Sequence, residues 1–223
     1  MLFQRLLKAI ISGKVKGHFS QYGEDIIIHK LFPRKNYKGL YIDIGAFHPF
    51  KFSNTAYLWA MGWKGINIDA NNNSIRKFKK FRPNDLNIYG AVVDSKTSCV
   101  KSSIPIYVKN EKKINAIGTC DAELANKRDL VNSLNVPTIS VNSIFEKVVN
   151  QKIDFLNIDI EGLDESILSE IDFKTYKPKV ICIEDYIDDL SSVLTSDITK
   201  KLYSKGYYLK ARVGPSSVFV HSE

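Results

Sequence analysis

Apolar and polar residues alternate along the chain in two different patterns. Short apolar runs that end in an acid or a glycine are typical of strands, whereas longer stretches with apolar residues three and four apart are typical of helices. The predicted strands cover residues 40–44, 65–69, 86–93, 153–160, 180–184, 207–213 and 217–221. The predicted helices cover residues 24–32, 73–81, 163–171 and 191–204, and another begins at residues 53–55. This alternation predicts an α/β fold whose mostly parallel sheet is flanked by helices.

The stretch from residue 95 to residue 135 is less regular than the rest of the chain. It combines a strand-like run at residues 104–108 with a candidate helix at residues 121–134. No repeat, low-complexity tract or linker divides the chain, so we predict a single domain over residues 1–223 with an insertion at 95–135. Insertions on a rigid scaffold are free to vary, and they often determine substrate specificity in α/β enzymes.

Residues 1–19 predict an amphipathic N-terminal helix. Its apolar residues have helical spacing, and Arg5, Lys8, Lys14 and Lys16 supply positive charge with no acid among them. Two interpretations stay open: a helix that lies peripherally on the inner face of a membrane, and a helix that packs on the domain or on a partner subunit. Because no run of about 18 apolar residues and no small-residue cleavage site is present, we expect a cytoplasmic protein.

The composition is that of an ordinary soluble globular protein, with 44% hydrophobic and 25% charged residues among 223. The formal net charge of +8 favours anionic partners. The lysines are scattered and form no compact basic motif with aromatic residues, so we expect no nucleic-acid partner. The charge leaves phosphorylated, nucleotide-linked and lipid-linked substrates open, and the sequence does not determine the oligomeric state. Of the three cysteines, Cys182 lies in an apolar run and is predicted to be buried.

Two of the predicted strands carry an acid at or near their carboxyl end. Asp43 precedes Gly45 after the first strand, and Asp69 ends the second. Ligands in open α/β sheets bind beyond the carboxyl ends of the strands, and Asp69 lies near the offset at which a carboxylate binds ribose hydroxyls. We therefore expect both acids to face one ligand-binding crevice.

The turn after the first strand favours one cofactor class over another. A dinucleotide site uses several glycines because pyrophosphate rests against the turn, whereas this turn offers Gly45 alone. The acid Asp43 would repel phosphate and attract the positively charged methionine part of S-adenosylmethionine. The sequence thus predicts S-adenosylmethionine as the cofactor, held by Asp43, Gly45 and Asp69. The alternative for Asp43 alone is a strand-end side chain that caps the next turn.

Four further acids follow two later strands. Asp159 and Glu161 fall at the carboxyl end of the strand predicted at residues 153–160, and Glu184 and Asp185 end the next one. We predict Asp159 and Glu161 as catalytic residues, because a hydroxyl that accepts a methyl group must lose its proton. Asp159, Glu184 and Asp185 could instead form an all-oxygen site for Mg²⁺. The alternative is that Glu184 and Asp185 cap helices or pair with lysines.

His48 is the histidine nearest to this predicted chemistry. It lies in the turn after Gly45, where it could face the cofactor or serve as a catalytic base. A role in stabilising the turn is an equally good interpretation, so both stay open.

These segments together resemble the FkbM-type methyltransferases. The matching segments are residues 20–25 (SQYGED), 43–49 (DIGAFHP), 53–55 (SNT), 62–71 (GWKGINIDAN) and 158–162 (IDIEG). The sequence departs from the pattern at Phe47, where a small polar residue is common, and at Asn157, where lysine is common.

The resemblance implies a class I methyltransferase fold, which is Rossmann-like, and S-adenosylmethionine as the cofactor. It also implies O-methylation of a sugar, nucleotide-sugar or glycan precursor, as in polysaccharide biosynthesis. By similarity, Gln21 and Glu24 would contact the methionine part, Asp69 the ribose and Asp94 the adenine, and we add Ser53 and Asn54 to the expected cofactor site. Two alternatives remain: a nicotinamide-dependent oxidoreductase, and a non-catalytic cofactor-binding module with the same fold.

Overall fold

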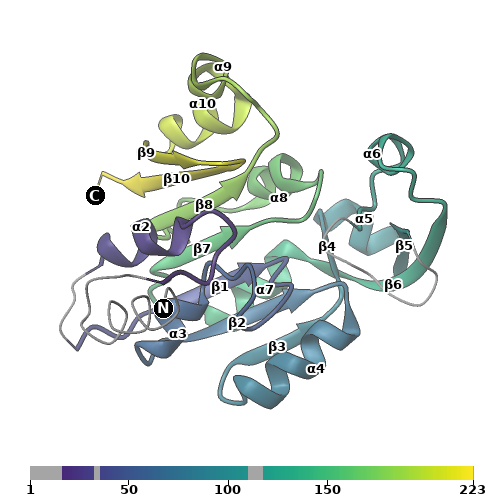
Figure 1. Ribbon diagram of the computed structural model, residues 1–223, viewed down its shortest axis with the longest axis horizontal. Helices are drawn as coiled ribbons and strands as arrows, with labels where there is room; N and C mark the ends of the chain where they lie inside the picture. The colour runs from purple at the N-terminus through teal and green to yellow at the C-terminus, as the bar shows by residue number, and fades with distance from the viewer. Residues whose placement is uncertain (1–16, 33–35, 110–117, 223) are drawn as a thin grey trace, which may run out of the picture.

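A seven-stranded sheet forms the centre of the molecule, with the strand order β3-β2-β1-β7-β8-β10-β9 (Figure 1). The computed structural model describes residues 17–32, 36–109 and 118–222. The strands are β1 (Leu40–Ile44), β2 (Lys64–Asp69), β3 (Leu86–Tyr89), β7 (Phe155–Ile158), β8 (Val180–Glu184), β9 (Tyr207–Val213) and β10 (Ser216–His221). The first five strands of this order are parallel, and β10 runs antiparallel to both β8 and β9. The predicted α/β fold with a mostly parallel sheet is confirmed.

The register of β1 brings three strand ends together. Ile44 lies beside Ile68 of β2 and beside Ile158 of β7. Because these strands are parallel, the residues at and just after their carboxyl ends meet at one edge of the sheet. The segments that carry Gly45, Asp69 and Asp159 are therefore brought to a common edge, although they are far apart in the sequence.

Helices cover both faces of the sheet because successive strand residues point to opposite sides. Ile42 and Ile44 belong to the larger apolar cluster, with α7 (Val141–Phe145), α8 (Asp164–Glu170) and α10 (Asp197–Ser204). Tyr41 and Cys182 belong to a second cluster, with α2 (Glu24–Lys30) and α3 (Ala56–Ala60). Cys182 is buried, as the sequence predicts. The remaining helices outside the insertion are α4 (Asn72–Phe81), the 3₁₀ helix η1 (Glu146–Val148) and α9 (Leu190–Thr195).

The irregular insertion forms a small sheet of its own, which lies to one side of the main sheet (Figure 1). Its strand order is β4-β6-β5, and two short helices belong to the same region. These elements are β4 (Ala91–Val93), α5 (Ser95–Val100), β5 (Ser103–Val108), α6 (Ala122–Lys127) and β6 (Asn132–Ser140). The strand-like run predicted at residues 104–108 is confirmed as β5.

Three predicted elements are divided in the structure. The strand predicted at residues 86–93 breaks at Gly90, where the chain leaves the main sheet and pairs with β6 instead. The helix predicted at residues 121–134 ends at Lys127, because the following residues pair with β5 as a strand. The helix predicted at residues 191–204 is two helices, separated at Ser196, whose hydroxyl caps α10.

The predicted N-terminal helix at residues 1–19 lies almost wholly outside the described residues, which begin at residue 17. Its membrane or partner contact stays a prediction. Among the described residues, no helix is both long enough and apolar enough to cross a membrane.

Candidate functional site

A cavity of about 620 Å³ lies at the carboxyl edge of the parallel strands. Gly45, Asp69, Asp159 and Glu184 bring the ends of β1, β2, β7 and β8 to its wall. The start of β4, parts of the insertion, and residues near α2, α3 and the start of β10 also line it. Its size is that of a small-molecule or cofactor site, and its location is the one expected for a ligand in an open α/β sheet.

Gly45 forms the turn over the end of β1. Its φ is +82°, and its N–H and that of Ala46 both donate to the carbonyl oxygen of Ile68, each at 3.0 Å. A Cβ at Gly45 would overlap the backbone carbonyl of Asp159. The turn therefore needs glycine for two reasons, its backbone conformation and its close approach to the β7 segment.

Asp69 is held by two backbone N–H groups at the end of β2. Its Oδ2 accepts from the N–H of Phe47 and its Oδ1 from the N–H of Asn71, both at 2.6 Å. Burial raises the pKa of Asp69 to about 6 although these hydrogen bonds lower it. Because each carboxylate oxygen has two acceptor positions, each can accept one more hydrogen bond. Asp69 lines the cavity and fits the predicted role of binding a pair of ribose hydroxyls.

Asp43 does not line the cavity, contrary to the expectation that it shares a crevice with Asp69. It is 1% exposed, and its carboxylate accepts hydrogen bonds from the Thr55 hydroxyl at 2.6 Å and the Asn157 amide at 3.0 Å. Burial raises the pKa of Asp43 above its usual value, and the nearby Arg82 guanidinium offsets part of this rise. In the structure Asp43 is hydrogen-bonded to polar side chains beneath the turn. This position agrees better with the capping alternative than with direct contact to the cofactor.

The other predicted cofactor residues divide into two groups. Gln21, Glu24 and Asn54 line the cavity. Glu24 is buried, and its carboxylate accepts from the N–H of Tyr22 at 2.8 Å and from the hydroxyl of Ser216 at 3.3 Å. These three residues add polar groups to the cavity wall, and the contact of Gln21 and Glu24 with the methionine part stays a prediction.

Ser53, Asp94 and His48 lie outside the cavity lining. The hydroxyl of Ser53 accepts from the N–H of Ala56 at 3.1 Å, next to the start of α3. Asp94 caps α5, accepting from the N–H and hydroxyl of Thr97. Nδ1 of His48 accepts from two backbone N–H groups two and three residues later. Of the two interpretations of His48, the turn-stabilising one agrees with these contacts, and Asp94 is placed as a helix cap.

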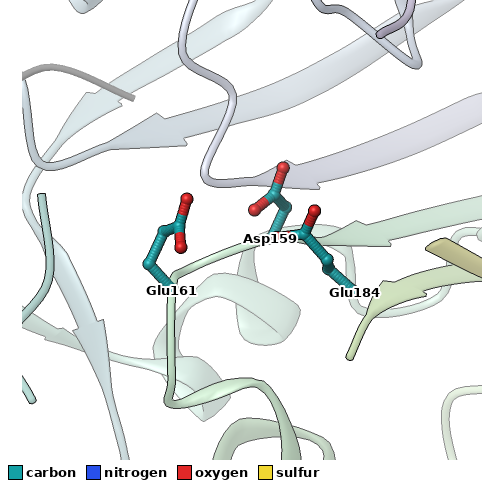
Figure 2. A group of neighbouring side chains, drawn as sticks. All are labelled: Asp159, Glu161 and Glu184. Carbon is teal, nitrogen blue, oxygen red and sulfur yellow. The ribbon is translucent and has the colours of Figure 1, made fainter. Parts of the chain in front are cut away.

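Asp159, Glu161 and Glu184 converge in the cavity, with carboxylate oxygens within 4.8 Å of one another (Figure 2). Asp185 does not join them. Its carboxylate forms an ion pair of 2.6 Å with Arg212, and both side chains are largely buried. The predicted Mg²⁺ set of Asp159, Glu184 and Asp185 is therefore corrected: Glu161 takes the place of Asp185, because the side chain after β8 turns towards Arg212.

A tyrosine and an arginine contact the carboxylates of this three-residue cluster. The Tyr186 hydroxyl lies within hydrogen-bond distance of Glu161 and, at 2.9 Å, of Glu184. Arg128, from the insertion, forms a 2.7 Å ion pair with Glu161 and lies over the Tyr186 ring. These contacts compete for the same oxygens that a metal ion would use.

Burial raises the pKa of Asp159 well above its usual value, and the neighbouring Glu184 raises it further. Burial also raises the pKa of Glu184, while its hydrogen bonds to Asp159 and Tyr186 lower it. Two carboxyl groups in contact do not both ionise readily, so each disfavours the charged form of the other.

The turn that presents Glu161 is fixed by two residues to which the sequence analysis gave no role. Glu161 has a φ of +56°, an uncommon backbone conformation for a residue with a side chain. Asp164 accepts from the N–H groups of Ile160 and Gly162, and the Thr119 hydroxyl donates to the carbonyl of Glu161. An acid two residues after a strand-end glycine is a sequence pattern that could have indicated Asp164, whereas no local pattern indicates Thr119.

Apolar side chains also line the cavity. They come from the end of β2, the start of β4, β5 and the loop before α8, and include Ala70, Ala91, Val92, Ile106 and Leu163. Such a surface suits the flat faces of a nucleotide base.

The charges of the cavity differ in sign from the charge of the whole chain. Among the described residues that line it, five are acids and one, Arg128, is a base. The chain as a whole has a net charge of +8. The acids are Glu24, Asp69, Asp159, Glu161 and Glu184. The cavity therefore favours a cationic ligand and disfavours phosphate.

The strand order and the cavity at the carboxyl edge agree with the class I methyltransferase fold expected from the sequence. A family model described as the Methyltransferase FkbM domain matches residues 43–209, well over half of the chain. The chain therefore belongs to the FkbM methyltransferase family, and the suspected resemblance is confirmed. A comparison with curated proteins finds no match.

Proposed function

We propose that this methyltransferase transfers a methyl group from S-adenosylmethionine to a hydroxyl of a sugar or a related hydroxylated metabolite. The observation that carries the proposal is the excess of acids in the cavity of a basic protein. S-adenosylmethionine has a positively charged sulfonium and an ammonium group, which an acid-lined cavity attracts. A nicotinamide dinucleotide has a negatively charged pyrophosphate, which the same acids would repel, and the turn at Gly45 offers it no glycine-rich cradle.

The residues that line the cavity fit each part of this cofactor. Asp69 has free acceptor positions for the ribose hydroxyls, and the apolar side chains of the cavity wall suit the adenine. Gln21, Glu24 and Asn54 would hold the methionine part, with Glu24 opposite its ammonium group. When bound, the cofactor supplies the methyl group on a sulfur that is a good leaving group.

Asp159 and Glu184 supply the group that accepts a proton in this proposal. A hydroxyl oxygen that takes up a methyl group must lose its proton, and a positioned base contributes about 10²–10⁴-fold to such a step. Burial raises the pKa of both members of the carboxyl pair, so an ionised member takes up a proton more readily than an exposed carboxylate does. Alignment of the acceptor oxygen with the methyl group supplies much of the remaining rate enhancement.

The acceptor end of the cavity supports an uncharged sugar ring. The Tyr186 ring is half-exposed beside Glu161 and Glu184, so an aromatic face and hydroxyl-binding carboxylates lie together. A phosphate on the reacting ring would meet these acids. Any nucleotide, phosphate or lipid portion of a larger acceptor would therefore lie outside this end of the cavity.

Calorimetric titration of the full chain with S-adenosylmethionine and with NAD tests the proposal. We expect binding of S-adenosylmethionine and no binding of NAD at millimolar concentration; the reverse would support an oxidoreductase instead. A second measurement uses labelled S-adenosylmethionine with a panel of neutral and phosphorylated sugars. Asp159→Asn should lower turnover about 100-fold while cofactor affinity changes little. Cofactor binding without transfer to any hydroxylated acceptor would support the non-catalytic alternative.

A further inference from the structure

A second cavity, of about 440 Å³, lies at the opposite edge of the main sheet from the first. Lys152 and Lys179, in its wall, precede β7 and β8, so they mark the amino ends of these parallel strands. His221 ends β10, which is antiparallel and therefore finishes at the same edge. The loop between α8 and β8 adds Lys174 and Lys177.

The lining of this cavity is strongly basic. Four of its nine lining residues are lysines and none is an acid. None of these four lysines forms an ion pair with another residue in the described part of the chain. Asp172 is the acid that interacts with Lys174, and its carboxylate also accepts from the Thr175 hydroxyl and the Lys174 N–H. The described lining residues thus give the cavity a net positive charge, which Asp172 offsets in part beside Lys174.

The backbone around the lysines is fixed by the sheet edge. The N–H of His221 donates to the carbonyl of Lys179 at 3.0 Å, and the Tyr207 hydroxyl donates to the carbonyl of Pro178 at 2.8 Å. Tyr176, in the cavity wall, packs against the ring of Phe145. The flexible ammonium groups therefore extend from a rigid frame, which reduces the entropy lost when they converge on a ligand.

We propose that this basic cavity binds a phosphate-bearing anion with at least two negative charges, such as a diphosphate group. Lysine ammonium groups are common phosphate-binding groups, and four lysines belong to this cavity wall. A five-residue strand spans about 17 Å, so this ligand would lie at the far end of the strands from the cofactor. The site is therefore separate from methyl transfer, and it would tether a soluble phosphorylated ligand or the headgroup of an anionic lipid.

Titration of the full chain with inorganic pyrophosphate at low salt tests the proposal. The double variant Lys177→Gln/Lys179→Gln should bind pyrophosphate about tenfold more weakly, and binding by the unmodified chain should weaken as salt is added. The matched control is Lys79→Gln/Lys80→Gln on α4, which removes the same charge from exposed positions outside the cavity and should change affinity less than about twofold. Thermal denaturation checks that both variants fold.

Sedimentation with vesicles of phosphatidylcholine, with or without phosphatidylserine, distinguishes the two sources of phosphate. Retention on the anionic vesicles that pyrophosphate reverses supports a lipid headgroup, and pyrophosphate binding without retention supports a soluble ligand. Absence of pyrophosphate binding at millimolar concentration would overturn the proposal. An equal loss of affinity in both double variants would also overturn it, because the effect would then arise from net charge alone.

Discussion

Gly45 packs directly against the backbone carbonyl of Asp159, so closely that no side chain fits between them. Gly45 follows β1 and Asp159 follows β7, and the two strands are neighbours in the sheet. This contact places the turn next to the carboxylate that we propose as part of the proton-accepting pair. The position of the turn at Gly45 and the position of Asp159 therefore depend on one another.

Replacing Gly45 with alanine tests this contact. The Cβ would overlap Asp159 and would occupy a backbone conformation with a φ of +82°, so we expect a loss of about 2 kcal/mol or more in unfolding free energy. Gly23→Ala is the matched control, because Gly23 also has a positive φ but open space around its Cβ position. Urea denaturation should show a larger loss for Gly45→Ala; equal losses would contradict the importance of the contact.

Cofactor affinity should depend on pH through Asp69. Its pKa is raised to about 6 in the free protein, and its proposed partner hydroxyls bind best to the ionised form. Affinity for S-adenosylmethionine should therefore fall as pH drops below about 6, by up to about tenfold per pH unit. Titrations at several pH values check this. Asp69→Asn should bind weakly and without this pH dependence, whereas Asp94→Asn, which retains a good helix cap, should behave like the unmodified chain.

Removing the Tyr186 hydroxyl should change the pH profile of methyl transfer. Its hydrogen bond lowers the pKa of Glu184, so Tyr186→Phe should raise that pKa and leave the base protonated to higher pH. The acid limb of the kcat profile should move to higher pH, with a loss of about threefold to tenfold in activity on that limb and near-normal activity above it. Tyr203→Phe, at an exposed position on α10, is the control. An unchanged acid limb would show that Tyr186 does not act through Glu184.

The ion pair between Asp185 and Arg212 should stabilise the fold. Both side chains are largely buried, and Asp185→Ala would leave the Arg212 charge unpaired, at an expected cost of about 3 kcal/mol in unfolding free energy. Asp197→Ala removes an exposed pair with Lys200 and should cost less than about 1 kcal/mol. Chemical denaturation of both variants measures the difference. An equally small loss of unfolding free energy for Asp185→Ala would contradict a stabilising role for this ion pair.

The sequence predicted the main sheet well because its strands are short apolar runs bounded by turns. The bounds of β1, β8 and β9 agree with the predicted ranges. The break at Gly90 escaped prediction, because residues 86–93 read as one apolar run whichever sheet they join. Only the pairing of β4 with β6 decides that the chain leaves the main sheet there.

Two of the predicted acids show the same contrast between what the sequence predicts and what the tertiary structure decides. Asp43 lies inside β1, so its side chain follows the strand alternation and points towards Thr55 and Asn157. Asp69 is the last residue of β2, and the turn beside it supplies backbone donors that hold its carboxylate in the cavity. Asp43 pairs with Asn67, two residues before Asp69, so Asp69 lies nearer the carboxyl edge and lines the cavity, whereas Asp43 supports it from within the sheet.

The sequence by itself determined the α/β class and the presence of acids near the strand ends, because these depend on local periodicity and residue type. The tertiary structure alone decided which acids meet. Arg128 reaches Glu161 from the insertion, and Tyr186 joins Glu161 to Glu184. Contacts between segments so distant in the chain leave no periodic pattern in the sequence, since they arise only when the strands align in register and the loops fold over their ends.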